Sequence, residues 1–119
     1  MHARSGLPVQ RDFYGIAREV DGKIVGAFGY DSFQPKGCQM HLCLESPAAL
    51  NRELLYQAFR VPFEQWNYSY LLAIIQEHNT KSLNMAARLG FKKFGEVPGH
   101  LRFGVMYKDE CRWLKLGQR

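Results

Sequence analysis

Two side chains in this sequence have the chemistry to move a proton during a reaction. Glu45 closes a run that alternates apolar and polar residues, and its carboxylate can serve as a general base. His78 follows an apolar run and precedes a polar loop, where an imidazole can take a catalytic role. Glu45 also has a plainer interpretation, as a solvated carboxylate that complements the dipole of the helix that follows it.

His41 and the three cysteines lead to different expectations. His41 is either a further base or a structural or surface histidine of a strand. Cys38, Cys43 and Cys111 are an odd number without a Cys-x-x-Cys motif, which argues against a disulfide framework and favours a reducing compartment. Cys38 and Cys43 are expected on opposite faces of one strand. His41, Cys43 and His78 match no metal-ligand spacing, so we expect no metal site.

The elements that position these residues follow from hydrophobic periodicity and turn residues. Strands are expected over 13–20, 23–30, 39–44, 69–76, 91–96 and 101–107. Asp21-Gly22 predicts a type I′ hairpin turn, because both central residues of that turn need positive φ. The run 69–76 is apolar throughout, which predicts a strand buried on both faces and parallel to 39–44.

Two helices are expected between these strands. The first should begin at Ser46-Pro47 and end or kink at Pro62, which cannot donate a backbone hydrogen bond. The second should span 80–89, with Leu83 and Ala87 facing inward and Gly90 as a left-handed C-cap. The order β-β-β-α-β-α-β-β predicts an α/β or α+β fold, whose mixed, mostly antiparallel sheet contains one parallel crossover.

Length and composition restrict the class of protein. The 119 residues suit a single domain over 1–119, with a loose arm over 1–11 and a C-terminal tail over 108–119. The apolar runs are too short to cross a bilayer and the start lacks the apolar run of a signal peptide, so we expect a cytoplasmic protein without membrane contact. The net charge of +5, concentrated in the last quarter, marks a solvated surface or a functional face. Nucleic-acid binding is disfavoured because no matching motif is present.

The most specific feature is the stretch from Asn79 to Phe91, NTKSLNMAARLGF. It resembles the Asn-x-x-Ala/Ser-x-x-Leu-Tyr-x-x-Leu-Gly-Phe stretch of the GNAT (Gcn5-related N-acetyltransferase) superfamily. The positions that match are Asn79, Ser82, the apolar Met85, Leu89, Gly90 and Phe91. The order of elements from about residue 13 to residue 107 is similar as well, and the chain looks closest to small phage and prophage members of that family.

The resemblance implies a fold, a cofactor and a site. Strands 39–44 and 69–76 would splay apart and receive the pantetheine arm of acetyl-CoA, which pairs with the backbone of Leu42, Cys43 and Leu44. The pyrophosphate would lie at the start of the following helix, because free N–H groups and the helix dipole favour an anion there. The residues implied at that start are Ala49, Leu50, Asn51 and Arg52. Asn79 and Ser82 would face the cofactor from the other side.

The sequence departs from the family pattern at three places. The phosphate loop, usually Arg/Gln-x-x-Gly-x-Gly/Ala, has Ser46, Ala49 and Asn51 at its defining positions, so Arg52 would supply the charged contact. The tyrosine that often protonates the leaving thiolate falls at Ala86, with Tyr56 and Tyr107 as substitutes. The family's first strand and two helices have no room before Phe13. That shortness predicts a homodimer whose second subunit completes the acceptor pocket.

Two functions therefore follow from the resemblance. The first is an acetyl-CoA-dependent N-acyltransferase that transfers an acetyl group to an amine of a small molecule or a protein. The alternative is a catalytically inactive GNAT-fold binding or accessory protein that acts through protein–protein contact, since fold alone does not determine function.

Overall fold

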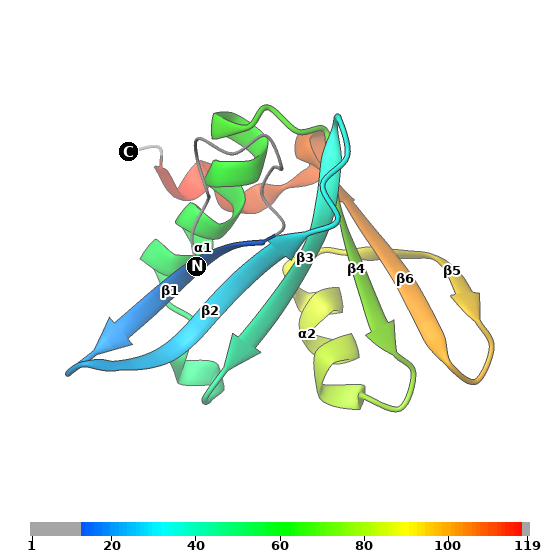
Figure 1. Ribbon diagram of the computed structural model, residues 1–119, viewed down its shortest axis with the longest axis horizontal. Coiled ribbons are helices and arrows are strands. Elements are labelled where there is room, and N and C mark those ends of the chain that lie inside the picture. The colour runs from blue at the N-terminus through cyan, green and yellow to red at the C-terminus, as the bar shows by residue number, and fades with distance from the viewer. Residues whose placement is uncertain (1–12, 118–119) are drawn as a thin grey trace.

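The computed structural model describes residues 13–117, which form one six-stranded sheet and two α-helices (Figure 1). The strands are β1 (Tyr14–Val20), β2 (Lys23–Asp31), β3 (Gly37–Leu44), β4 (Tyr70–Gln76), β5 (Lys92–Val97) and β6 (Leu101–Tyr107). The helices are α1 (Arg52–Arg60) and α2 (Thr80–Leu89). This confirms the predicted order β-β-β-α-β-α-β-β. The predicted arm over 1–11 lies outside the described residues.

The sheet is mixed, as predicted. Its strands lie in the order β1-β2-β3-β4-β6-β5, and β3 and β4 are parallel whereas all other neighbours are antiparallel. The parallel pair at the centre is joined through α1, which is the single crossover that the sequence predicts. The fold is therefore the α+β arrangement, with one parallel crossover, that the sequence predicts.

Local turn chemistry explains several of the boundaries. Asp21 and Gly22 both have positive φ, 53° and 79°, which confirms the predicted type I′ turn between β1 and β2. Gly90 ends α2 with φ of 113° and donates its N–H to the carbonyl oxygens of Ala86 and Ala87, as a left-handed cap does. α2 spans the predicted residues 80–89.

The core lies on one face of the sheet. Side chains alternate along each strand, so Phe28 and Tyr30 of β2 share a face with Met40 of β3, Leu71 of β4 and Met106 of β6. Both helices pack against this face and contribute Leu54, Ala58, Phe59 and Leu89 to the same buried cluster. We call it the helix-covered face. The opposite face carries no helix within residues 13–117, and we call it the open face.

The C-terminal tail packs onto the helices. Residues Arg112–Gly117 form a 3₁₀ segment beside α1, and the indole Nε1 of Trp113 donates to the carbonyl oxygen of Leu89 at 2.8 Å. Trp113 and Leu114 thus pack against the core and attach the tail to the domain. Phe59 and Phe63 are fully buried, as core residues should be, and Trp66 packs against the same cluster.

The start of α1 differs from the prediction. The residues Pro47–Ala49 form a separate 3₁₀ turn, and the α-helix begins only at Arg52. Asn51 is the N-cap, because its side-chain oxygen accepts the N–H of Leu54 at 2.8 Å. The prediction of a start at Ser46-Pro47 is therefore wrong. Both Ser46 and Asn51 have side chains that can cap a helix, but only Asn51 directly precedes the first α-helical turn. The helix ends at Arg60 and a π-helical turn containing Pro62 follows, which confirms the predicted end.

Two burial predictions are also wrong in part. Leu71 and Ala73 of β4 are buried beneath the helices, but Ile74 is 36% exposed, because it lies on the open face of the sheet. On α2, Ala87 is exposed and Leu83 half-buried. Met85, Ala86 and Leu89 form the inward face instead, since residues three or four apart share one side of a helix.

The remaining observations concern charge and membranes. Lys92 pairs with Glu110 at 3.1 Å, Lys93 with Glu96 at 2.8 Å and Arg102 with Glu77 at 3.5 Å, so these three basic side chains belong to a surface of mixed charge. No helix in the range 13–117 is both long and apolar enough to cross a membrane.

Candidate active site

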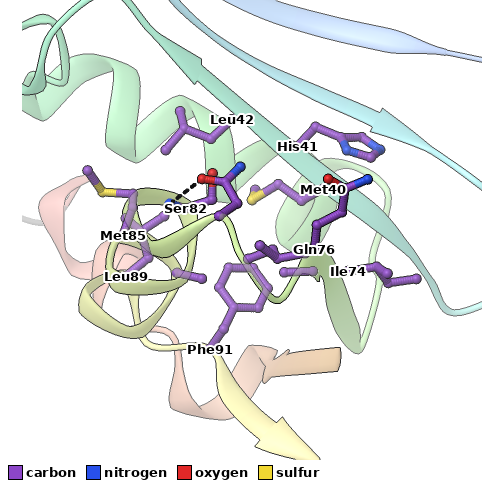
Figure 2. A pocket seen from close by; sticks show the side chains of 13 residues that line it. Met40, His41, Leu42, Ile74, Gln76, Ser82, Met85, Leu89 and Phe91 are labelled. Atoms are coloured by element: carbon purple, nitrogen blue, oxygen red, sulfur yellow. Dashed lines mark hydrogen bonds between the residues drawn. The ribbon is translucent and has the colours of Figure 1, made fainter. Parts of the chain in front are cut away.

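The central parallel strands pair only briefly. Gly37 pairs with Tyr70, Cys38 with Leu71 and Gln39 with Leu72, and beyond these positions the strands separate. β3 then continues to Leu44 and β4 to Gln76 without pairing to each other. The separation leaves a cleft of about 290 Å³ between the carboxyl ends of the two strands, with α2 as a wall (Figure 2).

The cleft passes through the sheet. Met40 and Leu42 line it from the helix-covered side of β3, whereas His41, which lies between them, lines it from the open side (Figure 2). On β4, Ala73 and Ile75 belong to the first side and Ile74 and Gln76 to the second. Two molecules can therefore meet inside it from opposite faces of the sheet.

The unpaired edge of β3 offers backbone hydrogen-bonding groups to this cleft. The N–H of Glu45 bonds to the carbonyl oxygen of Val25 in β2 at 2.9 Å, which fixes the direction in which its backbone groups point. Because N–H and C=O groups alternate sides along a strand, those of Met40, Leu42 and Leu44 face the gap and those of Cys43 face β2. Leu42 and Leu44 thus meet the requirement for backbone pairing with a ligand. The side chain of Cys43 is exposed and that of Cys38 buried, which confirms that they lie on opposite faces.

The start of α2 forms one rim of the cleft. Asn79 is its N-cap and accepts the N–H of Ser82 at 3.2 Å (Figure 2). Asn79, Ser82, Met85, Ala86 and Leu89 line the cleft at helical spacing. Asn79 and Ser82 are therefore where the sequence predicts them, opposite β3.

The start of α1 lies at the same end of the sheet (Figure 1). Arg52 is exposed in its first turn, where backbone N–H groups lack helical acceptors. Ala49 is buried, and its methyl group points inward, since a Cβ built on Gly26 of β2 would lie 3.5 Å from it. No residue from Glu45 to Arg52 has positive φ. The loop thus adopts its path without the glycines of the family pattern.

Arg18 contacts the loop before α1, a contact that the sequence analysis missed. Its guanidinium Nη1 donates to the carbonyl oxygens of Ala48 and Ala49 at 3.3 Å and 2.9 Å. The side chain reaches this loop from β1, which is distant along the chain but adjacent in the fold. No local pattern identifies such a contact, because it depends on how the loop packs against the sheet.

The two predicted catalytic residues lie outside the cleft lining. Glu45 forms an ion pair with Lys23, with 2.6 Å between its Oε2 and the lysine Nζ, and both side chains are largely exposed. His78 is exposed in the turn between β4 and α2. His41, by contrast, lines the cleft and contacts Asp31 of β2, with its Nε2 3.1 Å from each carboxylate oxygen.

A second groove continues from the cleft along the helices. It has a volume of about 390 Å³ and shares Met85 and Leu89 with the cleft. Arg88 and Arg112 line it, and the Arg112 guanidinium lies 4.2 Å from the centre of the Trp113 ring and donates to the carbonyl oxygen of Arg88. An anionic ligand that leaves the cleft along α2 would meet two guanidinium groups there.

The fold is similar to that of solved N-acetyltransferases. Campylobacter jejuni PseH in complex with acetyl coenzyme A is similar over 82% of this chain and 69% of its own, with a TM-score of 0.66 and 17% identity. A mutant form of the spermidine/spermine N-acetyltransferase SpeG from Vibrio cholerae is similar over 82% of this chain and 66% of its own, with a TM-score of 0.67 and 11% identity. The chain has a GNAT fold.

Sequence comparison adds no closer assignment. No protein-family model matches the chain, and no curated protein matches it. At these identities the structural likeness establishes the GNAT fold alone. Within that fold, Ala86 lines the cleft where the family pattern has a tyrosine, and neither Tyr56 nor Tyr107 is among the residues that line it. The hydroxyl substitutes considered from the sequence are therefore outside this cleft.

Proposed function

We propose that this protein is an acetyl-CoA-dependent N-acetyltransferase that acts on an amine. The observation that carries the proposal is the cleft between β3 and β4, which is lined from both faces of the sheet and from the start of α2. The PseH neighbour, whose complex contains acetyl coenzyme A, supports the choice of acyl donor.

The residues present fit such a donor. The backbone groups of Leu42 and Leu44 would pair with the amide groups of the pantetheine arm, and Asn79 and Ser82 would face it from α2. Residues Ala49 to Arg52 would receive the pyrophosphate at the start of α1, with the Arg52 guanidinium as the charged contact. When bound, acetyl-CoA supplies a thioester carbon that an amine can attack. The protein's own contribution is to hold the two reactants in line and to accept a proton.

Calorimetry with acetyl-CoA tests the proposal directly. We expect wild-type protein to bind, Arg52→Ala to weaken binding by about tenfold through loss of a charged hydrogen bond, and Asn79→Ala to weaken it as well. Lys36→Ala is a matched control, since it removes one exposed positive charge from the turn before β3, at the far end of that strand from the cleft. Absence of binding at millimolar acetyl-CoA would contradict the proposal.

A second candidate is a GNAT-fold protein that binds its partners without catalysis. The observation that favours it is the apolar rim of the cleft at Ala86, where no phenol is available to protonate a leaving thiolate. Release of free thiol from acetyl-CoA in the presence of a panel of amines separates the two candidates. Turnover that needs the amine supports the enzyme, and binding without turnover for every amine supports the second candidate. The acceptor, an amine of a small molecule or a protein, and the homodimer are predictions from the sequence that the structure does not test.

A further inference from the structure

His41 is the one ionisable side chain among the residues that line the cleft. The other lining residues that bear polar side chains are Gln76, Asn79 and Ser82, none of which exchanges a proton near neutral pH. An amine acceptor is mostly protonated at neutral pH and cannot attack until it loses a proton. A group that accepts this proton inside the cleft is therefore required, and His41 has the appropriate chemistry.

Asp31 determines which nitrogen of His41 is free. The carboxylate oxygens Oδ1 and Oδ2 both lie 3.1 Å from Nε2, and a carboxylate accepts hydrogen bonds. In neutral His41, Nε2 therefore carries the hydrogen and Nδ1 has the free electron pair. The register of β2 and β3 creates this contact, because Gly29 pairs with His41 and Asp31 with Gln39 on the same open face.

The His41–Asp31 pair is too exposed to contribute much to the free energy of folding. The side chains of His41 and Asp31 are 44% and 36% exposed, and such surface pairs contribute about 0–1 kcal/mol to folding. Other groups near His41 on the open face are Cys43 and Gln39 on the same strand, and the neutral Ile74 and Gln76 across the gap. The ring of Phe13 lies over Gly29, which pairs with His41 on β2. Among the described neighbours on β2, β3 and β4, Asp31 is thus the charged one.

We propose that His41 and Asp31 form a catalytic dyad in which His41 is the general base for the acceptor amine. The inference rests on the proposed acetyltransferase function and names the residue that carries its proton transfer. The acyl donor occupies the side of the cleft lined by Leu42, Ser82 and Met85, and the acceptor enters from the open face, where His41 lies (Figure 2). The two reactants then meet at the level of Met40 and His41, where the strands begin to separate.

The proton and electron balance of the reaction is as follows. Nδ1 of His41 takes one proton from the ammonium group, and Asp31 stabilises the imidazolium that results. The neutral amine nitrogen bonds to the thioester carbonyl carbon while the carbon–sulfur bond breaks, and the electron pair leaves with sulfur. The second proton lost by nitrogen goes to that thiolate, directly or through water. His41 then releases its proton to solvent, and the products are an amide and free coenzyme A.

Two variants and one control test the dyad by kinetics. His41→Gln should lower kcat/KM by about 10²-fold or more, the usual contribution of a general base, and remove the ascending limb of its pH profile. Asp31→Asn should lower kcat/KM by a smaller factor, and acetyl-CoA affinity should stay within about twofold in both. His100→Gln, an exposed histidine in the turn between β5 and β6, should leave rate and profile unchanged.

A measurement on the free protein separates the dyad from the proposed function. Long-range ¹H–¹⁵N spectra should show neutral His41 with its hydrogen on Nε2, and Asp31→Asn should give a mixture of the two tautomers. Wild-type turnover together with an unchanged rate and pH profile in His41→Gln overturns the dyad and leaves the acetyltransferase proposal intact. A hydrogen on Nδ1 in wild-type protein also overturns it. Failure of wild-type protein to bind acetyl-CoA overturns both proposals.

Discussion

Nη1 of Arg18 on β1 lies 2.9 Å from the carbonyl oxygen of Ala49, so the first strand holds the loop that leads into α1. The same nitrogen also donates to the carbonyl oxygen of Ala48 at 3.3 Å. The loop before α1 lacks the glycines of the family pattern, and the Arg18 side chain holds its backbone through these two hydrogen bonds. The position of the α1 start, where we place the pyrophosphate, depends on a residue that is far from it in sequence.

Removal of this guanidinium should weaken both the fold and ligand binding. Arg18→Met keeps most of the aliphatic stem, and loss of charged hydrogen bonds in a half-buried position should reduce the free energy of unfolding by about 1–2 kcal/mol. Acetyl-CoA affinity should fall several-fold, because the loop loses its preorganisation. Urea unfolding and calorimetry measure the two effects.

The control for Arg18→Met is Arg60→Met. Arg60 also donates hydrogen bonds through its guanidinium, to Gln57 and Gln65, but it lies at the opposite end of α1. We expect it to change stability by no more than about 1 kcal/mol and to leave acetyl-CoA affinity unchanged. Equal effects of the two variants on affinity would show that the Ala48–Ala49 contact does not position the site.

The catalytic residues predicted from the sequence can be compared with His41 in one assay. Glu45 is engaged with Lys23 at 2.6 Å and His78 is exposed, and neither lines the cleft. We therefore expect Glu45→Gln and His78→Gln to retain kcat/KM within about threefold, against a loss of about 10²-fold for His41→Gln. A loss of that size in either variant would show that the general base is the residue substituted in it, Glu45 or His78, and not His41.

The stability of the fold should decrease at alkaline pH. Burial raises the pKa of the Cys111 thiol above its ordinary value of 9.0, and burial also raises the pKa of the Tyr30 hydroxyl well above 10.0. Above about pH 9 the unfolded chain releases protons that the folded protein retains, so the free energy of unfolding falls as pH rises. One such group contributes a slope of at most about 1.4 kcal/mol per pH unit.

Denaturant unfolding between pH 8 and pH 11 measures this effect. Cys111→Ala should flatten the first part of the decrease, which begins near the ordinary pKa of a thiol. Cys43→Ala is the matched control, because its side chain is exposed on β3. A decrease of the same slope in Cys111→Ala as in wild-type protein would assign the alkaline instability to other groups.

The homodimer that the sequence predicts needs a measurement in solution. Sedimentation velocity over a wide concentration range should show a species of twice the mass of the 119-residue chain. If the second subunit completes the acceptor pocket, dilution below the dissociation constant should lower the specific activity. A profile that stays monomeric at high protein concentration would contradict this prediction.

The sequence by itself determined the features that depend on neighbours along the chain. Asp21-Gly22 specified the hairpin because only certain residues adopt positive φ without strain, and Asn79 and Gly90 specified both ends of α2 through their capping hydrogen bonds. The alternation of residues 39–44 placed Met40, Leu42 and Leu44 on the helix-covered face. The expectation of a GNAT fold rested on the resemblance of the stretch from Asn79 to Phe91 and of the order of elements to that family.

Only the tertiary structure decided where the chemistry can take place. Asn51, not Ser46, caps α1, because Pro47–Ala49 forms a separate 3₁₀ turn and the α-helix begins only at Arg52. Arg18 and Ala49 meet because β1 and the loop lie side by side in the fold, although their positions along the chain are 31 apart. His41 has a partner only because the register of β2 and β3 brings Asp31 beside it, and a shift of one residue would move it to the other face.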